Sequence, residues 1–147
     1  MKSEWMALAR YRFSRARETF QDGIALVDQG SLNSAVNRFY YAAFYAARAL
    51  LATKGVDSSR HSGVISLFSQ HFVKRGIVSS EVAKTLPRSF EKRLDTDYED
   101  FTTVDQREIK QLQRDIRQFI HCCEQAFTRL AGRQRTKTAR SSAPPKP

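Results

Sequence analysis

The sequence predicts an all-α protein, an up-and-down bundle of four long helices with one further helix that is shorter or broken. Apolar residues recur at spacings of three and four along most of the chain, and no stretch shows strand alternation or hairpin turn residues. The segment from Ser31 to Lys54 is apolar on almost every side and holds no glycine or proline. Such a helix must be buried nearly all round, so we expect the other helices to pack against it.

The first helix is predicted from Ser3, a plausible N-cap, to Asp28, with Gly30 as its stop. Only two residues separate it from the central helix, so the two should be antiparallel. The charged side of the first helix is predicted to be a solvated face, formed by Arg10, Arg12, Arg15, Arg17 and Glu18.

Two stripes of side chains run along the central helix at helical spacing. The first is predicted to be core and comprises Val36, Phe39 or Tyr40, Ala43, Ala47 and Leu50. The second is apolar in body and polar at its tips, and comprises Asn37, Tyr41, Phe44 and Arg48. We expect this second stripe to face the fourth helix or a second subunit, as one wall of a cleft that contains Arg93.

Three more helices follow. A third should begin after the loop at residues 57–59 and end by Gly76, and a fourth should begin at Ser79 or Ser80, with a kink or break at Pro87. Asp105 is predicted to cap the fifth helix, because Glu108 follows three residues later as in a capping box and apolar residues continue at helical spacing to Leu130.

Beyond Gly132 the chain is polar and basic, which predicts a folded domain at residues 1–131 and a disordered tail at 132–147. The net charge is +10, of which the tail supplies +5. This charge favours polyanion partners such as RNA. No apolar run is long enough to span a membrane, and the amino end lacks a signal-peptide pattern, so we expect a cytoplasmic protein.

The residue types exclude several kinds of catalysis. There is no phosphate-binding glycine loop, nucleophile elbow or HExxH motif, and the adjacent Cys122 and Cys123 do not have metal-ligand spacing, so no metal or other cofactor is expected. His61 begins the third helix and could contact a phosphate or be structural. Arg93 and Asp97 are four residues apart, which fits either an ion pair at a helix end or an arginine aimed at a phosphate.

Three segments together resemble one protein family. The run Ala35–Phe44, continued by Ala46–Leu51 and by Lys54 with Gly55, is similar to the second helix of bacterial and archaeal HEPN-domain proteins. The run His61–Phe68 resembles the next helix of the single-domain branch. Arg93–Tyr98 resembles its signature of arginine, three residues, aspartate and tyrosine. The resemblance covers about residues 3–130.

This resemblance implies a homodimeric helical bundle with Arg93 at or near the dimer cleft. The family includes metal-independent ribonucleases, notably toxins encoded beside a minimal nucleotidyltransferase antitoxin, and members without catalytic activity. In the nucleases a histidine follows the arginine after four to six residues, but Tyr98, Glu99 and Asp100 stand at those positions here. Asp100 also stands where some of these toxins offer a tyrosine for adenylylation. His61 could supply the missing imidazole from another helix.

The resulting hypothesis is a HEPN protein of a toxin–antitoxin or defence-type system that acts on or binds RNA. Its candidate catalytic residues are Arg93, Tyr98 and His61. Its candidate RNA- or ligand-binding residues are Arg93, Asp97, Asn37, Tyr41 and Arg48. The alternatives are a non-catalytic module that binds a nucleotide or a partner protein, such as a minimal nucleotidyltransferase, and a nucleic-acid binder that depends on the basic tail.

Overall fold

The computed structural model describes residues 3–98 and 103–141 of the chain, with side chains up to residue 133. The described residues form helices and connecting turns, without strands. The elements are α1 (Ser3–Asp28), α2 (Leu32–Ala52), α3 (His61–Phe68), the π-helical turn η1 (Ser69–Val73), α4 (Ser80–Ala83), α5 (Thr85–Tyr98) and α6 (Gln106–Ser141). The all-α prediction is confirmed.

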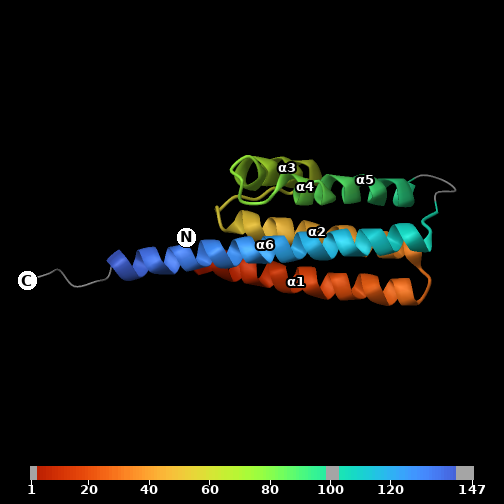
Figure 1. Cartoon of the computed structure of the whole chain (residues 1–147), viewed down its shortest axis with the longest axis horizontal. Helices are drawn as coiled ribbons and strands as arrows, with labels where there is room; N and C mark the ends of the chain where they lie inside the picture. Colours follow the sequence, from red (N-terminus) through yellow and green to blue (C-terminus); the bar gives the residue numbers. More distant parts are fainter. Residues whose placement is uncertain (1–2, 99–102, 142–147) are drawn as a thin grey trace, which may run out of the picture.

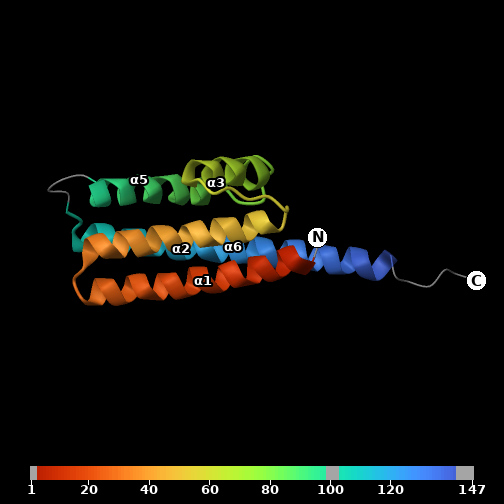
Figure 2. The ribbon, with the colours of Figure 1, turned by 180° about the vertical axis from the view of Figure 1, so that it is seen from behind.

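Helix α2 is the centre of the bundle. Figures 1 and 2 show α2 and α6 side by side in a middle layer, with α1 along one side and α3, α4 and α5 along the other. Helix α2 contacts α1, α6, α5 and α3. More than half of its 21 residues are buried, because its alanines let neighbouring helices approach closely. The largest fully buried side chains include Phe39, Tyr40, Phe68, Phe72 and Phe119.

Both predicted stripes of α2 are found. Every residue of the first stripe is fully buried, as predicted. In the second stripe Phe44 is buried, and the other three side chains are half-buried. Helix α2 therefore contributes its first stripe to the core, while the polar side chains of its second stripe partly reach the surface.

The first helix has the predicted bounds, but its charged face is not uniformly solvated. Arg12 is buried, and it donates to the Arg48 carbonyl oxygen (3.1 Å) and to Asp57 Oδ2 (2.7 Å). The prediction of a solvated Arg12 is therefore wrong. Spacing along one helix could not show that Asp57, in a loop 45 residues away, lies against α1.

The fourth predicted helix is broken, but not at Pro87. Helix α4 ends at Ala83 and α5 begins at Thr85, so Pro87 lies in the first turn of α5. Proline is tolerated there because the first turn has no intrahelical partners for its N–H groups. Ser79 caps α4, because its Oγ accepts from the Val82 N–H at 3.3 Å. The predicted cap at Asp105 is confirmed, because its Oδ1 accepts from the Glu108 N–H at 2.8 Å.

Helix α6 does not end at Gly132. It continues to Ser141, and Figure 1 shows its last part extending beyond the other helices. The helix continues through Gly132, because one glycine costs a helix only about 1 kcal/mol and no proline follows before Pro144. Residues 142–147 lie outside the described part of the chain, and the domain division at residue 131 stays a prediction.

Candidate functional site

Arg93 is fixed by aromatic rings and a carboxylate on the α2-facing side of α5. Its Nε donates to Asp97 Oδ2 at 3.2 Å, one helical turn along α5. Its guanidinium carbon lies 5.1 Å from the centroid of the Tyr41 ring and 5.7 Å from that of Tyr40. Only 13% of the Arg93 side chain is exposed. The tertiary fold thus holds this cation in one orientation by stacking, which an arginine plane allows and a lysine does not.

Asp97 also connects α5 to α2. Asn37 Nδ2 donates to Asp97 Oδ2 at 3.4 Å, and Asn37 Oδ1 accepts from Arg38 Nε and Nη2 at 3.1 and 2.7 Å. The Arg38 guanidinium carbon lies 5.2 Å from the Tyr41 ring centroid, so Tyr41 lies close to two arginines. A cavity of about 410 Å³ opens beside this network, lined by Leu26, Asn33, Ser34, Asn37, Arg38, Thr96 and Asp97.

His61, at the start of α3, joins the same group of residues. Its Nδ1 lies 2.7 Å from the Tyr40 hydroxyl. Its ring centroid lies 4.6 Å from that of Phe44 and 5.4 Å from that of Phe90, onto which it stacks at an interplanar angle of 16°. Burial lowers the pKa of His61 below its ordinary value of 6.5, and the positive charge of Arg93 lowers it further. The imidazole is therefore neutral near pH 7.

Tyr40 keeps its proton. Burial raises the pKa of its phenol above the ordinary value of 10, and the nearby charge of Arg93 only partly offsets this effect. A protonated Tyr40 can donate to His61 Nδ1, or accept from it if that nitrogen carries the proton. In the second arrangement Nε2 carries the lone pair, so the imidazole can accept a proton there.

The predicted site residues are thus divided by the structure. Arg93, Asp97, Asn37, Tyr41 and His61 form one connected group, which we call the Arg93 cluster. Its members are joined through Tyr40 and Tyr41. Of the second stripe of α2, Tyr41 lies beside Arg93, and Asn37 reaches it through the shared Asp97 carboxylate. The hydrogen bonds and rings come from α2, α3 and α5, so sequence spacing on one helix could not define them.

Arg48 belongs to a neighbouring ion-pair network. Its Nε and Nη2 donate to Asp57 at 3.0 and 2.9 Å, and the same carboxylate binds Arg12. Burial raises the pKa of Asp57, but the hydrogen bonds from Arg48 and Arg12 outweigh it and lower the pKa to about 2. Asp57 lies four residues before His61. This network therefore holds the α2–α3 loop, which leads to His61, against α1 and α2.

Tyr98 stands apart from the Arg93 cluster. It ends α5 and is 72% exposed, and within residues 3–98 and 103–133 no hydrogen bond or ring contact joins it to Arg93 or His61. The other two positions where a motif histidine could stand, Glu99 and Asp100, lie outside the described residues. His61 therefore supplies the imidazole that lies close to Arg93 in the described structure.

Sequence reasoning missed two contributors to the cluster, Tyr40 and Phe90. Tyr40 was predicted only as a core residue, yet it contacts both His61 and Arg93. Phe90, on α5, stacks on His61. The pair of adjacent tyrosines in an otherwise alanine-rich helix was the available signal, since a buried phenol needs a polar partner.

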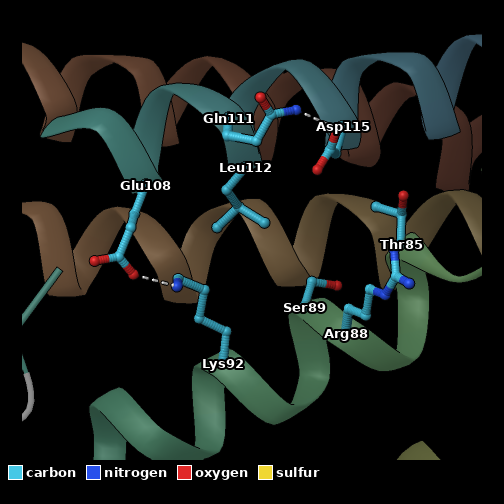
Figure 3. Close-up of a pocket in the computed structure, with 8 residues that line it drawn as sticks. All are labelled: Thr85, Arg88, Ser89, Lys92, Glu108, Gln111, Leu112 and Asp115. Carbon is cyan, nitrogen blue, oxygen red and sulfur yellow. Dashed lines mark hydrogen bonds and ion pairs between the residues drawn. The ribbon is translucent and has the colours of Figure 1, made fainter. Parts of the chain in front are cut away.

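A second pocket, of about 250 Å³, lies between α5 and α6 (Figure 3). Lys92 and Glu108 point toward each other across it and form an ion pair at 2.7 Å, and Gln111 donates to Asp115 at 2.8 Å. The buried Ser89 hydroxyl donates to the Leu86 carbonyl oxygen. Because these lining groups bind one another, this pocket is a weaker candidate for ligand recognition.

Among the described residues, no group of three or more His, Cys, Asp or Glu side chains is placed to hold a metal ion. No described helix is both long and apolar enough to cross a membrane. The site is an arginine, a neutral imidazole and polar side chains on the surface of an α-helical bundle.

The fold and the site define a class of helical-bundle proteins, and comparison with known proteins identifies it. The HEPN domain family model matches residues 9–126. The chain therefore belongs to the HEPN domain family. A "UPF0332 protein" of Thermotoga maritima is 39% identical over 123 residues, which are 84% of this chain and 93% of the relative.

Two archaeal relatives carry more informative names. "Putative toxin MJ0605" of Methanocaldococcus jannaschii is 34% identical over 83 residues, 56% of this chain and 62% of the relative. "Putative toxin MJ0142" of the same organism is 28% identical over 98 residues, 67% of each chain. Membership of the HEPN family, expected from the sequence, is confirmed.

Proposed function

We propose that this HEPN protein is a toxin-like component of a toxin–antitoxin or defence-type system and that its Arg93 cluster acts on RNA. The names of the two archaeal relatives support the toxin-like role. The observation that carries the action on RNA is the grouping of Arg93 and His61 around the Tyr40 ring. A fixed arginine binds a phosphodiester, and a neutral imidazole beside it accepts a proton.

The proposed reaction is an in-line attack of a ribose 2′-hydroxyl on the neighbouring phosphate. His61 Nε2 takes the proton from the 2′-hydroxyl, the 2′-oxygen bonds to phosphorus, and the 5′-oxygen of the next nucleotide leaves with a proton from water. Arg93 stabilises the negative charge that develops on the phosphate oxygens. The products are a 2′,3′-cyclic phosphate and a 5′-hydroxyl end, and no metal is required.

The test compares RNA decay by the wild-type protein and two arginine variants in a buffer with a metal chelator. Arg93→Gln should lower the cleavage rate by about 100-fold, the size of effect found when one electrostatic stabiliser is lost. Arg88→Gln removes an exposed cation from the same helix and should leave the rate unchanged. Circular dichroism should show folded protein in all samples. Equal decay with wild-type and Arg93→Gln would disprove the nuclease claim.

His61→Gln tests the base separately, because glutamine can still bond to Tyr40 but cannot accept a proton in the reaction. We expect a loss of about 100-fold or more in cleavage, with unchanged RNA binding. A rate that stays at the wild-type level would assign the base elsewhere and remove His61 from the mechanism. End analysis of the RNA by phosphatase sensitivity would identify the cyclic phosphate.

The second candidate function is a non-catalytic module that binds a nucleotide or a partner protein such as a minimal nucleotidyltransferase. The absence of a histidine shortly after Arg93 and the pairing of Arg93 with Asp97 favour it. On this proposal a homodimer copurifies with the neighbouring gene product, and changing Tyr41 and Arg93 together breaks the complex. A complex that survives both changes would contradict this second function.

A further inference from the structure

Three arginines surround a cavity near the end of the bundle where α6 extends beyond the other helices. The cavity measures about 450 Å³ and is lined by Arg75, Gly76, Ile77, Ala126, Arg129, Leu130 and Arg133. Arg75 follows η1, and Arg129 and Arg133 are one turn apart on α6. The three side chains belong to exposed residues. We call this feature the arginine pocket.

No carboxylate lines the arginine pocket. The ion pairs among the described residues include none that neutralises Arg75, Arg129 or Arg133. The sequence explains this: residues 58–80 and 125–147 contain no aspartate or glutamate. Three like charges that line one cavity without a counter-charge repel one another, and a bound anion would relieve this repulsion.

The geometry suits a phosphate. Arg129 Nη2 lies 3.4 Å from the Ile77 carbonyl oxygen, which ties α6 to the loop that carries Arg75. Arg129 and Arg133 are about 6 Å apart along the helix axis, so their guanidinium groups can reach the same phosphate or adjacent ones. A guanidinium offers two parallel donors to phosphate oxygens, which makes arginine the preferred residue for such contacts.

The sequence that follows the arginine pocket along α6 is also basic. Helix α6 runs on to Ser141, and the sequence of this extension adds Arg135, Lys137 and Arg140 without an acid. Figure 1 places the loop before α4 and this part of α6 toward the opposite end of the bundle from the C-terminal half of α5, which carries Arg93. A segment whose charged residues are all cations, next to such a pocket, suits a flexible polyanion with regularly spaced charges.

We propose that the arginine pocket binds the phosphate backbone of an RNA strand, as a second RNA contact apart from the Arg93 cluster. This inference rests on the proposed function for the choice of RNA. The pocket holds the backbone through Arg75, Arg129 and Arg133 and reads no bases. It adds affinity and salt dependence, whereas the Arg93 cluster carries out the chemistry.

The test measures the binding of fluorescent 2′-O-methyl RNA of 20 nucleotides, which the proposed reaction cannot cleave, across a series of salt concentrations. The pocket variant carries Arg75→Gln, Arg129→Gln and Arg133→Gln. The control variant carries Arg107→Gln, Lys110→Gln and Arg114→Gln, which remove three exposed cations from the other end of α6. Both variants lose the same charge, so a difference between them reports the pocket.

The pocket variant should lower the slope of log K against log salt by about 2, because each phosphate contact on a single strand contributes about 0.7. The control variant should lower it by less than 1. Equal slopes in the two variants would overturn the proposal. A charge-retaining variant with lysine at the three pocket positions should keep the wild-type slope, which guards against loss of slope through misfolding.

Two further outcomes separate this inference from its alternatives. A labelled polyglutamate of matched charge that binds the wild-type protein as tightly as the RNA would overturn the assignment to phosphodiesters and indicate an acidic protein partner. If Arg93→Gln leaves RNA decay unchanged while the pocket variant loses its salt slope, the nuclease proposal fails and the pocket proposal stands. If Arg93→Gln slows RNA decay while the pocket and control variants have equal salt slopes, the pocket proposal fails and the nuclease proposal stands.

Discussion

The hydroxyl of Tyr40 and Nδ1 of His61 lie 2.7 Å apart, which joins the buried centre of α2 to the first residue of α3. Tyr40 is fully buried and His61 is half-buried, so the hydrogen bond leads from the core to the surface of the bundle. The same Tyr40 ring lies beneath the Arg93 guanidinium. One core residue thus positions both the imidazole and the cation.

The pKa of His61 should depend on Arg93. Nuclear magnetic resonance titration of the imidazole should give a pKa below 6.5 in the wild-type protein, because burial and the Arg93 charge both disfavour the imidazolium. Arg93→Gln should raise this pKa toward its ordinary value, and Arg88→Gln should not change it. A pKa that is the same in all three proteins would show that the Arg93 charge does not act on His61.

The depressed pKa of His61 also determines how the free energy of unfolding changes with pH. Its folded-state pKa is depressed, so the unfolded chain binds a proton more readily, and the free energy of unfolding falls as pH drops below about 6.5.

Asp57 should stabilise the loop before His61 at neutral pH. Its pKa of about 2 lies below the ordinary 3.8, so its contribution is fully present above pH 3.8 and is lost as pH falls toward 2. Asp57→Asn should lower the free energy of unfolding at pH 7 by about 1 kcal/mol, since a third of this side chain remains in contact with solvent. Chemical denaturation at pH 7 and pH 2.5 measures this difference.

The expected signature is convergence of the wild-type protein and Asp57→Asn in stability at low pH. An Arg12→Met variant, combined with Asp57→Asn in a double-mutant cycle, should show that the two changes are not additive, because both groups share one hydrogen bond. A stability gap that persists unchanged at pH 2.5 would mean that Asp57 acts through packing and not through its charge.

Gly23 should be required for the close packing of α1 on α2. A Cβ at this position would lie 2.6 Å from Cε1 of the fully buried Phe39. Gly23→Ala should therefore lower the free energy of unfolding by about 1 to 3 kcal/mol, the cost of overpacking a core. Thermal and urea unfolding measure the change.

Gly132→Ala is the matched control within another helix. Nothing lies within 4 Å of a Cβ built at Gly132, so alanine should stabilise α6 by about 0.5 to 1 kcal/mol. Equal effects of the two substitutions would show that helix propensity and not the contact with Phe39 governs position 23.

The order of helices followed from local signals in the sequence. The caps at Ser79 and Asp105 and the bounds of α1 agree with the structure, because each depends on residues that are neighbours in the chain. Local signals were not sufficient for the end of α6 or for the position of the break before α5. The end of α6 and the break before α5 depend on small differences in helix stability, which Gly132 and Pro87 do not decide alone.

The sequence by itself determined that this chain is a helical bundle with α2 at its centre, because periodicity and apolar coverage are properties of one segment. It also proposed Arg93, Asp97, Asn37, Tyr41 and His61 as site residues. Only the tertiary structure decided that His61 lies with Arg93 around Tyr40, that Arg48 belongs with Asp57, and that Tyr98 stands apart. These relationships join side chains from different helices, and their distances depend on how the helices pack.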